Sequence, residues 1–208
     1  MTQHGAFPKA AALMVAALVA TTACDRQEDV PPGQPMDGTA EQPAQLPEEG
    51  VAPGAPAGGM VVELADGSGQ NVGGARLEPE GDGVRVSIRV TGLTPNQEHG
   101  LHFHENGVCE GPGFQSAGGH FNPQGTQHGL ENPAGPHAGD MPNIRANADG
   151  VADTTFVVTT VNLTSGTQNS LLRQGGTALV VHAGPDDYQT DPAGDAGARI
   201  ACGVIRGG

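Results

Sequence analysis

The chain has no tryptophan, one tyrosine and one lysine, and only 3% of its 208 residues are aromatic. The lysine is Lys9, so every other fixed positive side chain is an arginine. The formal net charge of −14 at pH 7 argues against a nucleic acid or an anionic lipid surface as partner. Long hydrophobic runs are also missing, because the apolar run at 10–20 is too short to span a membrane.

Residues 1–23 are typical of an export signal, with Lys9 first, then the apolar run, then small residues up to Cys24. A buried N-terminal helix is the alternative, but a linker rather than a domain follows. Cys24 lies where a bacterial lipoprotein is cut and lipidated, although Thr21 replaces the usual leucine three residues earlier. Ordinary signal cleavage nearby competes with this interpretation. We expect a lipoprotein-type signal and a periplasmic or cell-envelope protein that is anchored to a membrane through Cys24.

The next segment, 24–59, predicts a flexible tether. It contains seven prolines and almost no large apolar side chains, so it cannot bury enough surface to offset the entropy lost on ordering. The remaining residues, 60–208, have the usual size of one domain with one core.

Within 60–208, short runs rich in valine, isoleucine and threonine recur between turn signals. They predict eight strands and no long helix, with 165–174 as the one candidate for a short helical turn. This pattern indicates an all-β antiparallel sandwich or barrel. The expected strands are 60–64, 71–77, 84–90, 98–104, 143–146, 151–158, 177–183 and 199–205.

Two cysteines remain in the domain, Cys109 and Cys202. In an exported protein, such a pair most simply forms one disulfide, whereas two unpaired buried thiols are the alternative.

Histidines are concentrated in and beside the segment that follows the fourth expected strand. In 98–104, alternation places His102 and His104 on one face, presumed to be the outer one, and Leu101 and Phe103 on the core face. His99 has the opposite parity to His102, so we expect no ligand role for it. On its own, a His-x-His pair is a weak indication of a metal site.

A second group of histidines lies in the glycine- and proline-rich segment 105–142, and one more ends an expected strand. His120, His128 and His137 are followed by Asp140, and this three-nitrogen, one-oxygen set is one that zinc accepts. His182 ends the strand TALVVH. A bound metal would order a segment that has no core of its own, since its binding free energy becomes folding free energy. From spacing alone, generic metal buffering stays an alternative.

Five motifs, in order, resemble the copper/zinc superoxide dismutase family: GLHFHENGVCEG, SAGGHFNPQGTQHG, GPHAGDMPNI, LVVHAGPDD and AGARIACGVI. The resemblance covers 60–208. It implies an eight-stranded antiparallel Greek-key β-barrel with two long metal-site loops. It also implies one copper and one zinc ion per chain, and dismutation of superoxide to O₂ and H₂O₂.

The resemblance also implies roles for individual residues. Copper would be bound by four histidines: His102, His104, His120 and His182. Zinc would be bound by three histidines and a carboxylate: His120, His128, His137 and Asp140. His120 would bridge the ions, Asp186 would link His102 to His128, Cys109 and Cys202 would form the disulfide, and Arg199 would lie beside the copper.

The chain departs from the family pattern in its second long loop, 184–198. This loop is shorter than in the animal enzymes and holds four aspartates and no lysine. We therefore expect attraction of superoxide to depend on the metals and Arg199 against an acidic background. A non-catalytic metal-binding or copper-delivery module is the alternative function, although such relatives usually lack ligands or the arginine. A homodimer is left open, and we assign no role to Tyr188.

Overall fold

The computed structural model describes residues 59–207, and the expected signal, Cys24 and nearly all of the expected tether lie outside them. The described residues confirm the predicted all-β fold. They contain one 3₁₀ helix, η1 (Gln115–Ala117), and no helix long and apolar enough to cross a membrane. Their strands are β1 (Met60–Asp66), β2 (Asn71–Glu80), β3 (Gly83–Val90), β4 (Glu98–His99), β5 (Leu101–His104), β6 (Ile144–Arg145), β7 (Ala152–Val158), β8 (Thr177–His182) and β9 (Arg199–Ile205).

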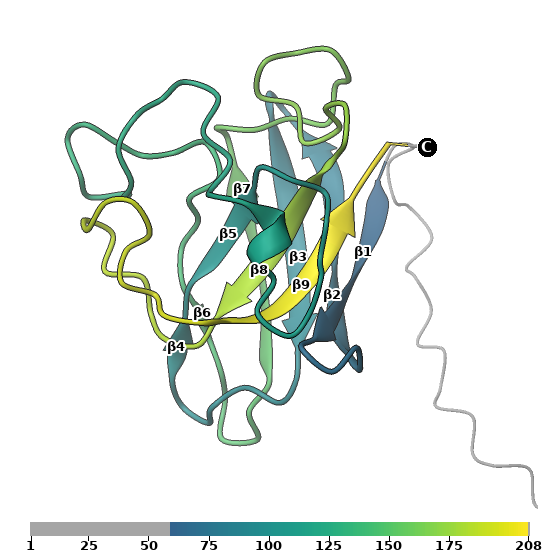
Figure 1. Ribbon diagram of the computed structural model, residues 1–208, viewed down its shortest axis with the longest axis vertical. Coiled ribbons are helices and arrows are strands. Elements are labelled where there is room, and N and C mark those ends of the chain that lie inside the picture. The colour runs from purple at the N-terminus through teal and green to yellow at the C-terminus, as the bar shows by residue number, and fades with distance from the viewer. Residues whose placement is uncertain (1–58, 208) are drawn as a thin grey trace, which may run out of the picture. The chain divides into compact units, whose positions relative to one another are not determined.

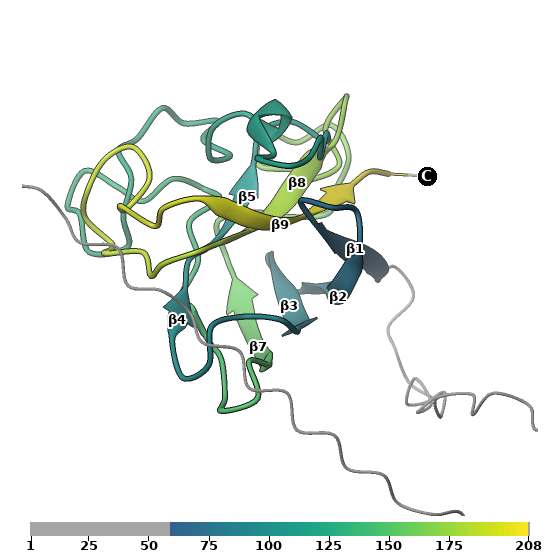
Figure 2. The ribbon, with the colours of Figure 1, turned by 60° about the horizontal axis from the view of Figure 1, so that its bottom comes forward.

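Seven strands form one antiparallel sheet, in the order β5-β8-β9-β1-β2-β3-β7, and β4 pairs with β6 beside it. The sheet curls so that its strands surround a common interior (Figures 1 and 2). Because neighbours in the sheet are often distant in sequence, the connections cross the ends of the barrel. This arrangement is the Greek-key β-barrel expected from the sequence.

Alternating burial along the strands builds the core. In β3, Val84, Val86, Ile88 and Val90 are buried, and the residues between them are exposed or half-buried. Side chains in a strand point alternately to its two faces, so this pattern lines the barrel interior with one face of β3. Each large apolar side chain buried in this way contributes about 1.5–3 kcal/mol of transfer free energy.

The fourth expected strand, 98–104, is divided at Gly100, which raises the strand count above the predicted eight. Glu98 and His99 pair with β6, whereas the residues from Leu101 onward pair with β8. Gly100 lies where the chain changes partners, and a Cβ there would come within 2.9 Å of the Ala196 Cβ. The helical turn expected in 165–174 is absent, since that segment forms turns instead.

The two long loops, 105–142 and 184–198, lie on the same side of the barrel (Figures 1 and 2). The predicted disulfide ties the first of them to β9, with 5.7 Å between the Cα atoms of Cys109 and Cys202. Beside it, Phe114 and Ala117 pack against Cys202 in a small cluster separate from the main core. Loop 105–142 is therefore attached to β9 by the disulfide and by the apolar contacts of Phe114 and Ala117.

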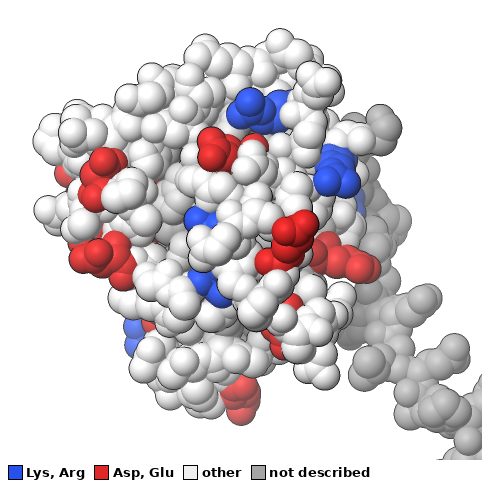
Figure 3. Space-filling view, viewed as in Figure 1, with Lys and Arg blue, Asp and Glu red and all other residues white. Residues whose placement is uncertain are grey.

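On the face shown in Figure 3, charged side chains are scattered rather than gathered in one patch. Residues 60–208 carry sixteen acidic side chains and seven arginines, so the domain has an acidic background.

Candidate metal centre

The structure brings the predicted ligand residues together in two adjoining clusters. In each cluster the potential ligand atoms lie within 4.8 Å of one another. The first cluster consists of His102, His104, His120 and His182. The second cluster consists of His120, His128, His137 and Asp140. Every member is buried, with at most 7% of its surface exposed.

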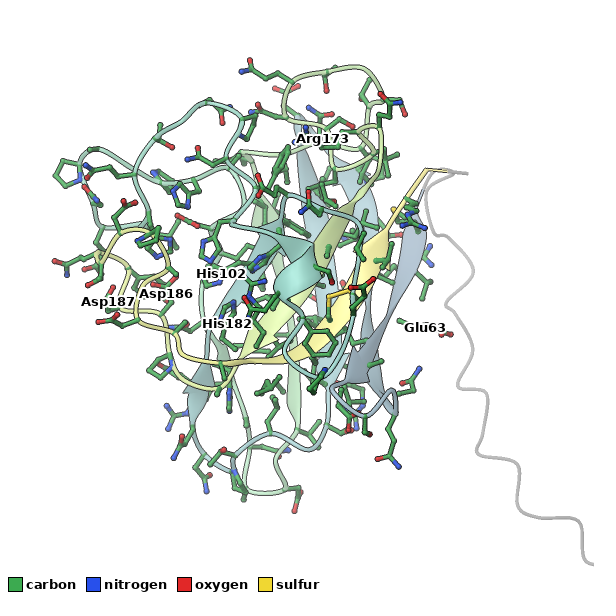
Figure 4. The ribbon with its side chains drawn as sticks, in the orientation of Figure 1. Glu63, His102, Arg173, His182, Asp186 and Asp187 are labelled. Carbon is green, nitrogen blue, oxygen red and sulfur yellow. A yellow bond between two sulfur atoms is a disulfide. The ribbon has the colours of Figure 1, made fainter. Side chains whose placement is uncertain are left out.

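Strand β5 positions two members of the first cluster, and β8 positions a third. His102 and His104 project from the same face of β5, while Leu101 and Phe103 belong to the core, as alternation predicts. In Figure 4, His102 and His182 lie side by side, with Asp186 on the adjacent loop. The sequence predicted that the histidine face of β5 is exposed, and this prediction is wrong. The long loops cover that face, and His102 and His104 have no exposed surface.

Backbone hydrogen bonds hold loop 105–142 against β5. The Phe103 N–H donates to the Gly139 carbonyl at 2.9 Å, and the Phe121 N–H donates to the Phe103 carbonyl at 2.7 Å. Isolated bridges also pair His104 with His120, and His102 with Asp140. The loop thus extends the sheet locally, and this backbone pairing places the potential ligands of the loop beside those of β5.

Hydrogen bonds at the outer ring nitrogens fix the tautomers in the first cluster. His104 Nδ1 contacts the Gly118 carbonyl at 3.1 Å, and His182 Nδ1 contacts the Gly197 carbonyl at 3.2 Å. Since a carbonyl only accepts, these nitrogens carry the hydrogen and leave a lone pair on Nε2. His102 Nε2 donates to Asp186 Oδ2 at 2.7 Å, which leaves its lone pair on Nδ1.

The inner nitrogens of this cluster are buried and make no hydrogen bond: His102 Nδ1, His104 Nε2, His120 Nε2 and His182 Nε2. A buried nitrogen lone pair without a partner is costly. Four such lone pairs that converge on one point fit a transition metal that accepts imidazole ligands, such as copper.

The second cluster is built around Asp140. Its Oδ2 accepts hydrogen bonds from the backbone N–H groups of Gly129 and His137, both at 2.9 Å. Its Oδ1 lies 3.0, 3.1 and 3.4 Å from the Nδ1 atoms of His120, His128 and His137. A tetrahedron with metal–nitrogen bonds of 2.0–2.1 Å has edges of about 3.3 Å, so the four atoms fit a zinc ion.

His120 belongs to both clusters, with Nε2 in the first and Nδ1 in the second. Its ring stacks on that of His102, with 3.9 Å between the centroids. Asp186 forms a second connection, because its two oxygens accept hydrogen bonds from His102 and His128 at 2.7 and 3.0 Å. The clusters therefore form one connected centre.

Burial keeps three histidines of the first cluster neutral. Desolvation lowers the pKa of His104 to about 2, that of His182 to about 3 and that of His120 to about 4. The first two are lowered further by the charge of Arg199. At neutral pH these rings hold no extra proton that a metal would have to displace.

The carboxylates act in the opposite direction. Burial lowers the pKa of His128, but its hydrogen bonds to Asp140 and Asp186 outweigh that effect and raise it to about 9. Burial also opposes ionisation of both carboxyls, yet the histidine hydrogen bonds hold their pKa values well below the usual range. The second cluster thus contains the negative charge of Asp140 and has that of Asp186 beside it.

The two loops approach so closely that glycine is required at the contacts. Gly194 has φ of 61°, and a Cβ there would lie 1.9 Å from Asp186 Oδ1 and 2.6 Å from His128 Nε2. Gly129 has φ of 114°, and a Cβ there would lie 2.1 Å from the Tyr188 carbonyl oxygen. Loop 184–198 is therefore packed directly on the second cluster.

Two residues that hold Asp186 were not found from the sequence, Asn143 and Tyr188. The Asn143 side chain bonds both the N–H and the carbonyl of Asp186, each at 2.9 Å. The Asn143 N–H donates to the Tyr188 hydroxyl at 2.8 Å, and the Tyr188 N–H donates to Asp186 Oδ1 at 2.7 Å. The one sequence signal was that the lone tyrosine stands beside the aspartates of this loop.

Arg199, at the start of β9, lies beside the first cluster. Its guanidinium donates to the Phe114 carbonyl at 2.7 Å and to the Gly118 carbonyl at 2.6 Å. Gly118 is also the acceptor for His104, so one carbonyl links the arginine to the cluster. Burial lowers the pKa of Arg199, but a guanidinium stays charged at any working pH. Three of its five N–H groups remain free for an anion.

Among the described residues, His99 is a member of neither cluster. It is fully buried, and its Nδ1 lies 2.9 Å from the backbone carbonyl of His182. It packs behind the first cluster rather than in it.

Comparisons with known proteins agree with this centre. The family model for copper/zinc superoxide dismutase matches residues 72–205. Cu-Zn superoxide dismutase 2 of Aquifex aeolicus is 53% identical over 145 residues, which cover 70% of this chain and 85% of that protein. The Cu-Zn superoxide dismutase of Caulobacter vibrioides is 44% identical over 142 residues, which cover 67% and 81% respectively.

Solved structures show the same likeness. A SOD-like protein from Bacillus subtilis matches with a TM-score of 0.68 and 39% identity, over 70% of this chain and 97% of that one. The Cu/Zn superoxide dismutase from Brucella abortus matches with a TM-score of 0.59 and 33% identity, over 71% and 99%. This chain belongs to the copper/zinc superoxide dismutase family, and it is an oxidoreductase whose cofactors are copper and zinc.

Proposed function

We propose that the first cluster binds copper, that the second binds zinc, and that His120 bridges the two ions. The donor sets support this assignment, because four imidazoles suit copper and three imidazoles with a carboxylate suit zinc. The outer hydrogen bonds support it as well, since they leave the lone pairs of the first cluster directed inward. Copper, when bound there, supplies the one-electron oxidation and reduction that turn two superoxide ions into O₂ and H₂O₂.

Arg199 binds the substrate in this mechanism. Superoxide is a small anion, and the guanidinium is held rigidly by the carbonyls of Phe114 and Gly118. A donor that is already fixed loses little entropy when the anion arrives, and its charge stabilises the anion beside the cluster. In an acidic domain, this local positive charge and that of the bound metals would together attract superoxide to the centre.

His120 moves a proton. Its Nδ1 is held in the second cluster beside Asp140, at 3.0 Å from Oδ1, so Nε2 is the nitrogen that can exchange a proton. Nε2 faces the first cluster and has no competing hydrogen-bond partner. We propose that it takes up a proton in the first half of the cycle and gives it to the second superoxide, with another proton coming from water.

The second cluster has a structural role. Zinc supplies no redox chemistry, but when bound there it holds His120 in place and adds positive charge. Gly129, His137 and Asp140 all lie in loop 105–142, so their convergence on one point also orders that loop.

We also propose that this activity protects the cell envelope from superoxide. The support is the sequence alone: an export-type signal at 1–23 and Cys24 at a lipoprotein-like cleavage position. Detection of a lipid-modified Cys24 by mass spectrometry of the membrane fraction would support the anchor, and an unmodified mature N-terminus in the soluble envelope fraction would contradict the anchor alone. Recovery of the protein in the cytoplasmic fraction would contradict protection of the envelope.

The observation that carries the proposed catalytic function is the position of His120 between the clusters. The test is to load the purified domain with copper and zinc, to record anomalous scattering at both metal edges, and to measure superoxide decay. We expect one ion of each kind on opposite nitrogens of His120 and a sharp loss of turnover in His120→Gln. Binding of a single ion, or unchanged turnover in that variant, would overturn the proposal. Two bound ions without turnover would instead favour the metal-binding module.

A further inference from the structure

One histidine of the second cluster lacks the outer hydrogen bond that the others have. The outer nitrogens of His102, His104, His128 and His182 all contact a carbonyl or carboxylate oxygen within 3.2 Å. His137 Nε2 makes no hydrogen bond among the described residues, although only 7% of the His137 side chain is exposed. The polar atom that faces it is Asp191 Oδ1, at 3.8 Å.

Asp191 is fixed near this histidine by a different contact. Its Oδ1 accepts a hydrogen bond of 2.7 Å from the backbone N–H of His128, another member of the second cluster. Asp191 comes from loop 184–198, so its carboxylate crosses from one long loop to the other. About half of its side chain is exposed, which leaves room for a water molecule beside the carboxylate.

We propose that Asp191 is a positioning residue for the zinc site, which accepts the Nε2–H of His137 directly or through one water. This inference rests on the proposed function, in which the second cluster binds zinc. A distance of 3.8 Å exceeds that of a direct hydrogen bond, and a bridging water or a small side-chain rotation closes the gap. An acceptor at Nε2 fixes the hydrogen there, directs the Nδ1 lone pair at the ion and makes that nitrogen more basic.

The comparison with Asp186 defines what Asp191 does. Asp186 contacts one histidine of each cluster, His102 and His128, so its loss should affect both ions. Within residues 59–207, the side-chain hydrogen bonds and ion pairs of Asp191 are to His128 and His137, both in the second cluster. Loss of the Asp191 carboxylate should therefore weaken zinc binding and leave copper binding unchanged.

The test compares Asp191→Asn with Asp195→Asn. Asp195 lies in the same loop, is exposed, and makes no side-chain hydrogen bond or ion pair in the described part of the chain. Its φ of 49° is tolerated by asparagine, so the control removes the same charge without added strain. The asparagine at 191 keeps the oxygen that accepts from the His128 N–H but removes the negative charge opposite His137 Nε2, which separates loss of that charge from loss of the loop contact.

Two measurements on the metal-loaded protein do not depend on activity. One is the rate and extent of zinc transfer to a competing chelator, and the other is the visible spectrum of Co²⁺ substituted in the second cluster. We expect Asp191→Asn to weaken zinc retention about 10-fold and to change the cobalt spectrum, and Asp191→Ala to weaken retention by up to about 100-fold. Asp195→Asn should match the wild type, and copper retention should be the same in all variants.

Equal zinc retention and equal cobalt spectra in Asp191→Asn and Asp195→Asn would overturn the inference, as would an equal loss of copper and zinc. Failure of the proposed function looks different. If the wild-type protein takes no zinc or cobalt into the second cluster, both proposals fall before any variant is compared.

Discussion

Replacing Arg199 by alanine should slow superoxide turnover without emptying the metal clusters. The guanidinium is not a member of either cluster, and its hydrogen bonds are to the carbonyls of Phe114 and Gly118. Removal of the side chain takes away the fixed positive charge beside His104 and the guanidinium N–H groups that the proposed mechanism uses to bind the anion. The His104 contact to the Gly118 carbonyl does not require the arginine, so the first cluster should keep its geometry.

The size of the loss follows from the interaction that disappears. A hydrogen bond to a charged group contributes about 1.5–3 kcal/mol, which corresponds to roughly 10- to 150-fold in rate. Arg199 is only half-buried, and solvent and salt weaken its field, so the lower part of the range applies. We expect kcat/KM for Arg199→Ala to fall roughly 10- to 50-fold, and its dependence on ionic strength to weaken.

The assay is stopped-flow decay of superoxide at several salt concentrations, with copper and zinc content measured on the same samples. Arg199→Lys is the matched control, because it keeps the charge but cannot donate to both carbonyls and to the anion with one planar group. We expect it to keep the salt dependence of the wild type while losing part of the rate. If Arg199→Ala retains full metal content, the wild-type rate and the wild-type salt profile, the role given to the arginine is wrong.

Three further predictions follow from the packing and charges of the centre. Gly194→Ala should weaken retention of both metals, since its Cβ would lie 1.9 Å from the Asp186 carboxylate; normal metal content after dialysis would refute the close contact. Binding of zinc to the metal-free protein should release a proton at pH 7, because His128 is protonated below its pKa of about 9. This proton release should vanish above about pH 9. Calorimetry in buffers of different ionisation enthalpy measures the number of protons released. Conversely, the stability that this proton gives the metal-free protein should be lost as pH rises through about 9. Replacing Cys109 and Cys202 by serine should lower the free energy of unfolding in urea by about 2–5 kcal/mol, since the disulfide joins residues 93 apart; an unchanged midpoint would show that the link is dispensable.

Most strands could be predicted from the sequence, because the alternation of apolar and polar residues that indicates a strand is a local pattern. Alternating valines and isoleucines in 84–90 predict a strand with one buried face, and β3 has that pattern. The pattern did not predict that the strand expected at 98–104 is divided at Gly100, because that division depends on which strands the two halves pair with. β4 pairs with β6 and β5 pairs with β8, and no local signal encodes a change of partner.

The same limit applied to the site. Motif order predicted two groups of side chains, seven residues in all, and the structure brings each group together. Motif order could not show that loops would bury His102 and His104 completely. Nor could it identify Asn143 and Tyr188, since amide and hydroxyl side chains in loops have many ordinary uses. The role of Asn143 and Tyr188 in holding Asp186 follows only from the hydrogen bonds that they make to it in the folded structure.

The sequence by itself determined which groups are available: imidazoles and carboxylates at set intervals, two cysteines, an arginine after the last loop, and alternating apolar residues that predict an antiparallel sandwich or barrel. Only the tertiary structure decided which nitrogen of each ring faces inward and which carboxylate stands behind it. The type of ligand atom is a property of the side chain, so it can be determined from the sequence. Tautomer, burial and outer hydrogen bonds arise between segments as far apart as His102 and Asp186, and they exist only once the loops have closed over the strand.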